Sequence, residues 1–341
     1  MTGKALATLD WHYKGMKTLV MENRLVRIVF LLDKGGDIIE LKYKPLDLDL
    51  MWHAPQGHVN PAEYIPPIAT AESSFNDLYG GGWQDALPVI GNGPQEHRGA
   101  KYGTHGETPV MRWNCEILEA EGSAASAVLR VEGIRYPFAL EKTVRIENDQ
   151  TSLHLSERLS NLSPQILEFF WLQHPSFGEP FLAPGNTIAL PPISEIENFD
   201  EMNPNGRIAG GSFSWPVVKS RRGAAPIDLS EIPPRDLVAE ETSFIKVKEG
   251  WYALKNPRLG LTFRLEWDPQ IFRWVWFWQN YNLPDYPYYG SAWNVAIEPA
   301  TSLPNNLAKQ WRDNDGIKIQ GKSSISTELK ATIDLQNKVR P

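Results

Sequence analysis

Short runs of alternating or continuous apolar residues, separated by turn residues, constrain the fold of this sequence most strongly. Residues 19–30 predict a β-hairpin, because two runs rich in apolar and β-branched side chains flank a turn at Glu22, Asn23 and Arg24. Residues 324–335 alternate apolar and polar side chains, which is typical of an exposed strand of an antiparallel sheet.

Similar runs recur along the chain, while helical periodicity is nearly absent. A single short helix is expected over residues 305–311, after Pro304. Many short strands joined by turn-rich segments indicate an all-β sandwich or barrel. The further strands are expected at residues 38–43, 112–119, 127–131, 138–146, 152–159, 167–172, 187–190, 244–248, 251–254, 261–267 and 273–278.

Two segments lack this pattern of strand-length apolar runs. Residues 55–77 and 180–234 are rich in Pro, Gly, Asn and Ser, and they are long for structureless connections within a compact domain. Loops of this length usually form lids or carry binding residues. The sequence contains no internal repeat and no change of composition that would mark a boundary. We therefore expect residues 1–341 to form a single domain.

Charge and cysteine content narrow the classes of function. The net charge is −7 over 341 residues, so the surface would tend to repel polyanions, and we do not expect nucleic acid as a partner. Cys115 is the only cysteine, which excludes an intrachain disulfide. The N-terminus lacks a signal-peptide layout, and the longest apolar runs, such as 26–32 and 272–278, are too short to span a bilayer. We expect a cytoplasmic protein without membrane association; its oligomeric state stays open.

A glycine-rich segment, Gly80-Gly-Gly, precedes Trp83, Gln84 and Asp85. Glycines allow a close approach of the backbone to a ligand or a strand, and no phosphate-loop context follows them. Tryptophan is a stacking surface for sugar rings, and the Gln and Asp side chains can bind hydroxyl groups. Two interpretations remain equally open: a sugar-contacting loop with Trp83, Gln84 and Asp85 as substrate-binding residues, or a hairpin with its aromatic side chain in the core.

His105 and Glu107 lie in the segment Thr104-His-Gly-Glu107 and would share one face of a strand. A substrate-contacting pair, a lone surface histidine and a metal site that also uses His97 are the three alternatives. The spacing matches no common metal motif, so we predict no metal ligands and assign Glu107 to substrate binding.

Two further ionisable residues emerge from apolar strands. His174 follows the apolar run 166–172, where an unpaired imidazole would be costly to bury, and it can exchange a proton near neutral pH. Glu298 follows Val295, Ala296 and Ile297, so its carboxyl group is neutral, paired or tuned as a general base. The alternatives are a satisfied core histidine and a structural salt bridge.

The three segments together resemble the aldose 1-epimerase (galactose mutarotase-like) family. His105 resembles the histidine of the family's His-Gly motif, and His174, in Gln173-His-Pro-Ser-Phe177, resembles the histidine of its Asn-His-x-Tyr-Phe segment. Glu298, before Pro299, resembles its late glutamate. The resemblance implies a galactose mutarotase-like β-sandwich (supersandwich) with long loops, and a protein that converts α and β anomers of an aldose or sugar derivative.

By this resemblance, Glu298 would remove the proton of the anomeric hydroxyl, His174 would protonate the ring oxygen, and His105 would bind the sugar and stabilise the charge on that oxygen. The reaction needs no metal or redox cofactor. Trp278 and Gln279 fall on a strand that faces the family's site, and are further substrate-binding candidates. A small-molecule sugar would be the partner.

The sequence departs from the family pattern in one respect: the early arginine of the family has no clear counterpart, since the matching region reads Trp83-Gln-Asp85. This affects the identity of the sugar more than the type of reaction. The alternative is a non-catalytic carbohydrate-binding protein of the same fold. A glycan lyase or hydrolase is disfavoured, because such enzymes usually add a large helical domain.

Overall fold

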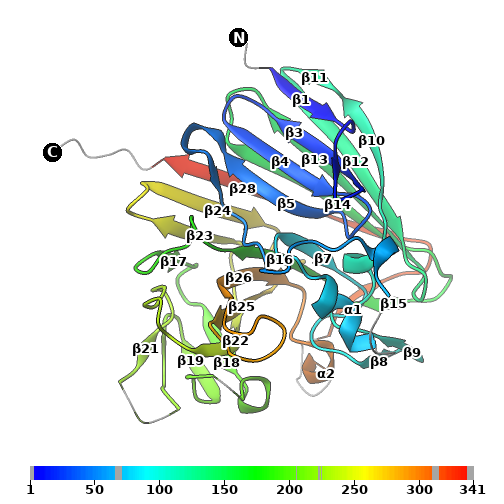
Figure 1. The fold of residues 1–341 in the computed structure, drawn as a ribbon. Helices are drawn as coiled ribbons and strands as arrows, with labels where there is room; N and C mark the ends of the chain where they lie inside the picture. The colour runs from blue at the N-terminus through cyan, green and yellow to red at the C-terminus, as the bar shows by residue number, and fades with distance from the viewer. Residues whose placement is uncertain are drawn as a thin grey trace.

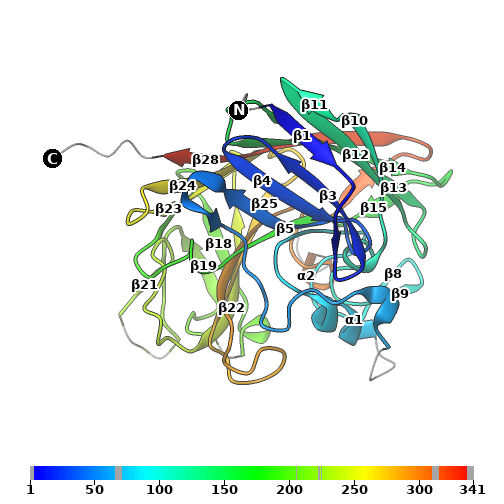
Figure 2. The same cartoon turned by 45° about the horizontal axis from the view of Figure 1, so that its top comes forward.

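The computed structural model describes residues 4–65, 71–204, 206–221, 223, 225–308 and 315–335, with residues 71–74 described by their backbone alone. Two large antiparallel sheets dominate the described chain, and their N-terminal and central strands face each other in both views (Figures 1 and 2). The all-β prediction is confirmed. No helix within the described ranges is both long and apolar enough to cross a membrane.

The larger sheet has fourteen strands. Its main path runs, in spatial order, through β11 (Glu121–Gly122), β1 (Ala5–Thr8), β3 (Met16–Glu22), β4 (Val26–Leu31), β5 (Asp37–Tyr43), β7 (Trp83–Ala86), β16 (Leu172–Phe177), β26 (Trp293–Ala300), β25 (Trp274–Tyr281), β22 (Ala239–Lys246), β18 (Glu195–Asn198) and β19 (Gly211–Ser214). Two short strands, β2 (His12–Tyr13) and β6 (Leu48–Asp49), pair with β3 and β5.

The smaller sheet has eight strands. Their spatial order is β10 (Asn114–Glu119), β12 (Ala124–Glu132), β13 (Phe138–Glu147), β14 (Ser152–Asn161), β28 (Ser324–Leu335), β24 (Leu261–Trp267), β23 (Trp251–Asn256) and β17 (Thr187–Ala189). Two-stranded pairs complete the β-structure: β15 (Leu167–Phe169) with β27 (Ile317–Ile319), β20 (Val217–Val218) with β21 (Ile227–Asp228), and β8 (Gln95–His97) with β9 (Ala100–Tyr102).

Most predicted strands are confirmed. The hairpin is formed by β3 and β4, with Leu19 opposite Phe30. The strand predicted at 324–335 is β28, which lies between β14 and β24 rather than at an edge, and its alternation places every second side chain in the core. The predicted helix at 305–311 is α2 (Asn305–Ala308) in its described part, and residues 309–311 lie outside the described residues.

The two segments expected as long loops contain regular structure. Residues 55–77 include η2 (Pro61–Glu63) and most of α1 (Ala71–Leu78), which is too short for an apolar periodicity to stand out in the sequence. Residues 180–234 include β17 to β21 and η4 (Asp200–Met202). The remaining short helices are η1 (Lys44–Leu46) and η3 (Thr108–Val110).

The main hydrophobic core lies between the two sheets. It joins side chains such as Leu19 and Phe30 of the larger sheet to Leu140, Leu155 and Phe263 of the smaller one, all completely or almost completely buried. Removing this apolar surface from water is the main stabilising contribution to the fold.

A charged cluster also lies between the sheets. The Nζ atom of Lys142, on β13, contacts the carboxylate of Asp85, on β7, and lies 3.1 Å from Oε1 of Glu157, on β14. The Nε2 atom of Gln173, on β16, donates to Oε2 of Glu157 at 2.9 Å and to Asp85. All four side chains are almost fully buried, so the carboxylates depend on the single ammonium group for compensation.

Replacing Lys142 by Met should therefore destabilise the protein strongly, because the buried Asp85 carboxylate would lose its cation and Glu157, whose pKa burial raises to about 8, would lose a hydrogen-bond donor. We expect a loss of about 3–5 kcal/mol in the free energy of unfolding, measured by urea denaturation. The control is Lys330→Met, at an exposed position of β28. A loss in the Lys142 variant as small as in this control would show that the cluster does not depend on its charge.

Candidate active site

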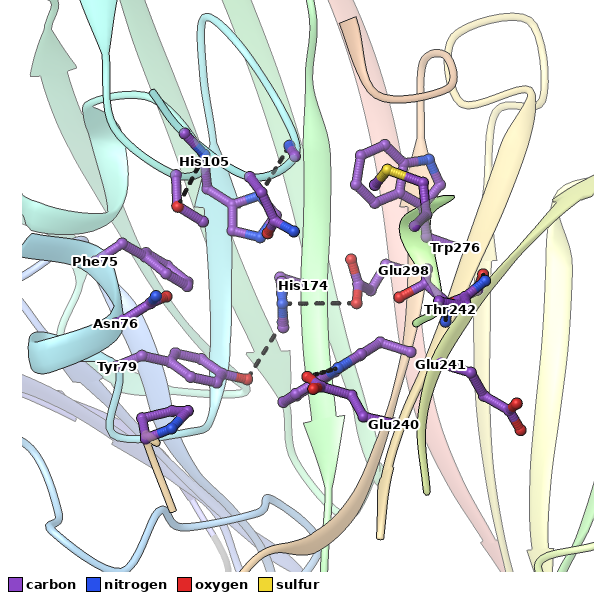
Figure 3. Close-up of a pocket in the computed structure, with 18 of the residues that line it drawn as sticks. Phe75, Asn76, Tyr79, His105, His174, Glu240, Glu241, Thr242, Trp276 and Glu298 are labelled. Atoms are coloured by element: carbon purple, nitrogen blue, oxygen red, sulfur yellow. Dashed lines mark hydrogen bonds and ion pairs between the residues drawn. The ribbon is translucent and has the colours of Figure 1, made fainter. Parts of the chain in front are cut away.

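His105, His174 and Glu298 converge on one cavity of about 640 Å³, as the sequence analysis requires for a shared reaction centre. The ring centroids of His105 and His174 are 5.2 Å apart, and Nε2 of His174 lies 3.5 Å from Oε1 of Glu298. Figure 3 shows the three side chains around the same space, with His174 between Tyr79 and Glu298. Trp278 also lines the cavity.

Strand pairing brings His174 and Glu298 together. On β16 and β26, Leu172 lies opposite Ala300 and Ser176 opposite Ala296, so His174 is placed opposite Glu298. Cross-strand partners share one face of a sheet, and their side chains are close enough to interact. The contact between imidazole and carboxyl group is thus a direct consequence of the register of these two strands.

Burial determines the protonation of this pair. Loss of hydration raises the pKa of Glu298 well above its usual value and lowers the pKa of His174 to about 4. No cation within the described part of the chain pairs with Glu298, and its Oε2 atom is buried without a hydrogen-bond partner there. Both shifts favour a proton on the carboxyl group of Glu298 over a proton on the imidazole of His174.

Two hydroxyl groups contact the other nitrogen of His174. The Nδ1 atom lies 3.3 Å from the hydroxyl of Tyr79 and 3.3 Å from that of Ser176, and the two hydroxyls hydrogen-bond to each other. A hydroxyl can either donate or accept, so Nδ1 keeps a partner whether or not it carries a proton. This allows the ring to gain and lose a proton without leaving a buried nitrogen unpaired.

His105 is fixed by its backbone and by Gly91. Its φ of 59° is in the left-handed region, which is uncommon for residues other than glycine. The His105 N–H donates to the Gly91 carbonyl at 3.1 Å, and the Gly91 N–H donates to His105 Nδ1 at 3.4 Å. Since Nδ1 accepts, the proton of the neutral ring is on Nε2. Burial lowers the pKa of His105 well below its usual value.

Comparison with known proteins places the chain in a family. A family model described as "Domain of unknown function (DUF4432)" matches residues 13–333. The chain belongs to this family. No curated protein matches the sequence. The DUF4432 description names no activity.

Solved structures similar to this DUF4432 member include proteins named for aldose 1-epimerase and galactose mutarotase. A Klebsiella pneumoniae protein provisionally named aldose 1-epimerase is 16% identical, with a TM-score of 0.73 over 96% of this chain and 83% of that one. A galactose mutarotase-like protein of Clostridium acetobutylicum is 13% identical, with a TM-score of 0.69 over 97% and 99%. The Slr1438 protein of Synechocystis is 17% identical, with a TM-score of 0.66 over 93% and 96%. The galactose mutarotase-like fold is thus confirmed.

The segment Trp83-Gln-Asp85 does not line the cavity of this DUF4432 chain. Trp83 and Asp85 alternate with Gln84 on β7, and both face the region between the sheets. Trp83 Nε1 donates to Gln173 Oε1 at 2.7 Å, and Asp85 belongs to the Lys142 cluster. Gln84 Nε2 donates to the Gly81 carbonyl at 2.6 Å. The core alternative describes Trp83 correctly, and direct sugar contact by these three residues is not supported.

Glu107 and Gln279 also have partners within the protein. The carboxylate of Glu107 accepts three backbone N–H groups, those of residues 134, 135 and 136, at 3.0–3.2 Å. Gln279 alternates with Trp278 on β25, and its Oε1 accepts from Arg207 at 3.2 Å. Neither side chain lines the cavity. Within the described ranges, no three His, Cys, Asp or Glu side chains gather as metal ligands.

The structure adds cavity residues that the sequence analysis missed. Phe75 and Tyr79 come from α1 and the residue after it, and the ring of Phe75 lies 4.8 Å from that of His105. Glu240 lies on β22, four residues before the predicted start of that strand. Trp276 lies beside Glu298 in the sheet. The sequence does contain a signal for Trp276, because Trp274, Trp276 and Trp278 alternate along one strand and therefore share one face of the sheet.

The protonation of His174 can be measured directly. Because burial lowers its pKa to about 4, we expect the ring to stay neutral from pH 5 to 8 in an NMR titration of the histidine resonances. His53 provides a control in the same spectra, since its hydrogen bond to Asp49 raises its pKa above the usual value. A His174 midpoint at or above that of His53 would contradict this description of the cavity.

Proposed function

We propose that this protein is an aldose 1-epimerase-like isomerase that interconverts the α and β anomers of an aldose or sugar derivative. The observation that carries the proposal is the juxtaposition of His174 and Glu298 in a cavity large enough for a sugar. Trp276 and Trp278 line the same cavity and offer aromatic faces to the apolar side of a sugar ring.

The reaction needs one base and one acid. The Glu298 carboxylate takes the proton of the anomeric hydroxyl, and the electron pair of that O–H bond forms the carbonyl at C1. The C1–O5 bond breaks, and O5 takes a proton from the His174 imidazolium. After rotation about the C1–C2 bond, the same steps in reverse close the ring as the other anomer.

This scheme requires His174 and Glu298 to hold one proton between them. One proton held by the pair gives either a neutral carboxyl group with a neutral imidazole, or a carboxylate with an imidazolium. Burial favours the first state. A bound sugar hydroxyl can donate to Oε2 of Glu298, which has no partner in the described structure, and so favours the second, reactive state.

His105 completes the arrangement. Its Nε2 carries the ring proton, because Nδ1 accepts from Gly91, and the ring lies next to His174. We assign it to hydrogen bonding with the sugar and to stabilisation of the negative charge that develops on O5 when the C1–O5 bond breaks. The lowered pKa keeps the ring neutral, so it acts as a donor without competing for the catalytic proton.

A non-catalytic carbohydrate-binding protein is the second candidate. The observation that favours it is the direct contact at 3.5 Å between His174 and Glu298, which partner each other in the cavity. In either case the partner is a small sugar molecule. We also propose a cytoplasmic location, since the only cysteine excludes an intrachain disulfide.

Anomer equilibration tests the enzymatic proposal. The protein should accelerate the change in optical rotation of at least one freshly dissolved single-anomer sugar in a broad panel. Glu298→Gln keeps the shape of the side chain but removes the base, and should lower the rate at least about 100-fold while sugar binding persists. Glu328→Gln, at an exposed position of β28, is the control. Binding without acceleration for every sugar would leave the carbohydrate-binding alternative.

The rate should have a bell-shaped dependence on pH. On the acidic side the pair gains a second proton on His174, whose lowered pKa places this limb near pH 4. On the alkaline side the pair loses its only proton from Glu298, whose pKa is raised by burial. The apparent pKa values of the two limbs belong to the coupled His174–Glu298 pair and not to either residue alone. An acidic limb at the usual histidine value in kcat/KM would show that His174 is not buried in the working enzyme.

A further inference from the structure

The sheet that carries His174 also presents to the cavity a carboxyl group that no cation compensates in the described structure. Glu240, on β22, lines the cavity, and its Oε1 accepts a hydrogen bond from Trp278 Nε1 at 3.2 Å. This indole is a neutral donor. Burial raises the pKa of Glu240, and no neighbouring positive charge in the described chain opposes that effect. An anionic group in such a place is stabilised by a ligand that brings a positive charge.

Glu241, the next residue on β22, differs from Glu240 because a cation within the protein compensates its charge. The carboxylate of Glu241, beside the same cavity, lies 2.7 Å from the guanidinium of Arg207 and also accepts the backbone N–H of Arg207 at 2.7 Å. Its charge is therefore balanced within the protein. Adjacent residues on a strand face opposite sides, which explains why only Glu240 points toward His174 in Figure 3.

Other groups around the cavity increase its negative character. Asp77 accepts hydrogen bonds from the hydroxyls of Tyr64 and Tyr286, which are neutral donors. Among the described residues that line the cavity, none is a lysine or an arginine. A phosphate or carboxylate on the sugar would thus meet like charge.

Glu240 is close enough to the reaction centre to contact the same small molecule. The ring of Trp278 has its centroid 6.0 Å from that of His174, and the same ring donates to Glu240. One indole therefore separates the proposed acid from this carboxylate. The ring of Tyr288 also lines this side of the cavity, and aromatic faces attract ammonium groups.

From this geometry we propose that the site selects a sugar carrying a protonated amine, with the ammonium group bound by Glu240 between Trp278 and Tyr288. The inference rests on the proposed function for its orientation, because His174 and Glu298 are taken to hold the anomeric end. It names the substrate class as cationic amino sugars, and it excludes sugar phosphates and sugar acids.

Calorimetric binding of glucosamine, glucose and glucose 6-phosphate tests this proposal, at a pH below the pKa of the amine. Glucosamine should bind about tenfold more tightly than glucose, the gain expected of one partly buried charge pair, and glucose 6-phosphate should bind more weakly than glucose. Glucosamine binding no tighter than that of glucose would overturn the proposal. Tighter binding of glucose 6-phosphate would do the same.

The variant Glu240→Gln sharpens the test, because its amide oxygen can still accept from Trp278 while the charge is removed. We expect glucosamine affinity to fall to that of glucose, with glucose affinity changed less than about twofold. Glu328→Gln should retain the preference. An unchanged preference for glucosamine in the Glu240 variant would remove Glu240 from the subsite.

The binding test of the ammonium subsite and the kinetic test of the proposed isomerase can fail independently. Amine preference without any accelerated anomer equilibration would support the ammonium subsite and reject the isomerase. Accelerated equilibration of glucose without amine preference would support the isomerase and reject the subsite. Unfolding temperatures of all variants, measured alongside, show whether a loss of binding reflects a loss of structure.

Discussion

The alternation of side chains along β16 is the constraint on which both the core and the cavity depend. Gln173 points between the sheets, where it binds Asp85 and Glu157, and His174 points the opposite way, toward Glu298. A slip of one residue in the pairing of β16 would exchange these two faces. It would place an imidazole in the charged cluster and an amide in the cavity. The Lys142 cluster therefore holds the strand in the one register that builds the site.

Much of the architecture could be predicted from the sequence. The strand predicted at residues 261–267 has the same bounds as β24, because apolar and other side chains alternate regularly along it. Short elements such as α1 could not be predicted, since eight residues give too little periodicity. The convergence of His105, His174 and Glu298 followed from the family resemblance and not from spacing, because their proximity arises from pairing between strands far apart in the sequence.

The substrate-binding predictions for Trp83, Gln84, Asp85 and Gln279 treated consecutive residues as one surface, and the structure places none of these residues on the cavity lining. Trp83, Gln84 and Asp85 read as a binding loop, but β7 is a strand, so neighbouring side chains face different sides. Gln279 differs from Trp278 for the same reason. Conversely, Glu240 lies four residues before the predicted start of its strand, and the observed pairing of Glu240 with Asn280 shows that β22 extends far enough to include it.

The two faces of the central strands have a consequence for how this protein could diverge. Residues that define the proposed ligand contacts, such as Glu240 and Trp278, alternate with residues that hold the sheet together, such as Glu241 and Gln279. Substitution on one face leaves the hydrogen bonds of the other intact. The fold can thus acquire a new ligand preference through single replacements on β22 and β25, while the pair proposed to transfer protons on β16 and β26 and the interior of the protein stay unchanged.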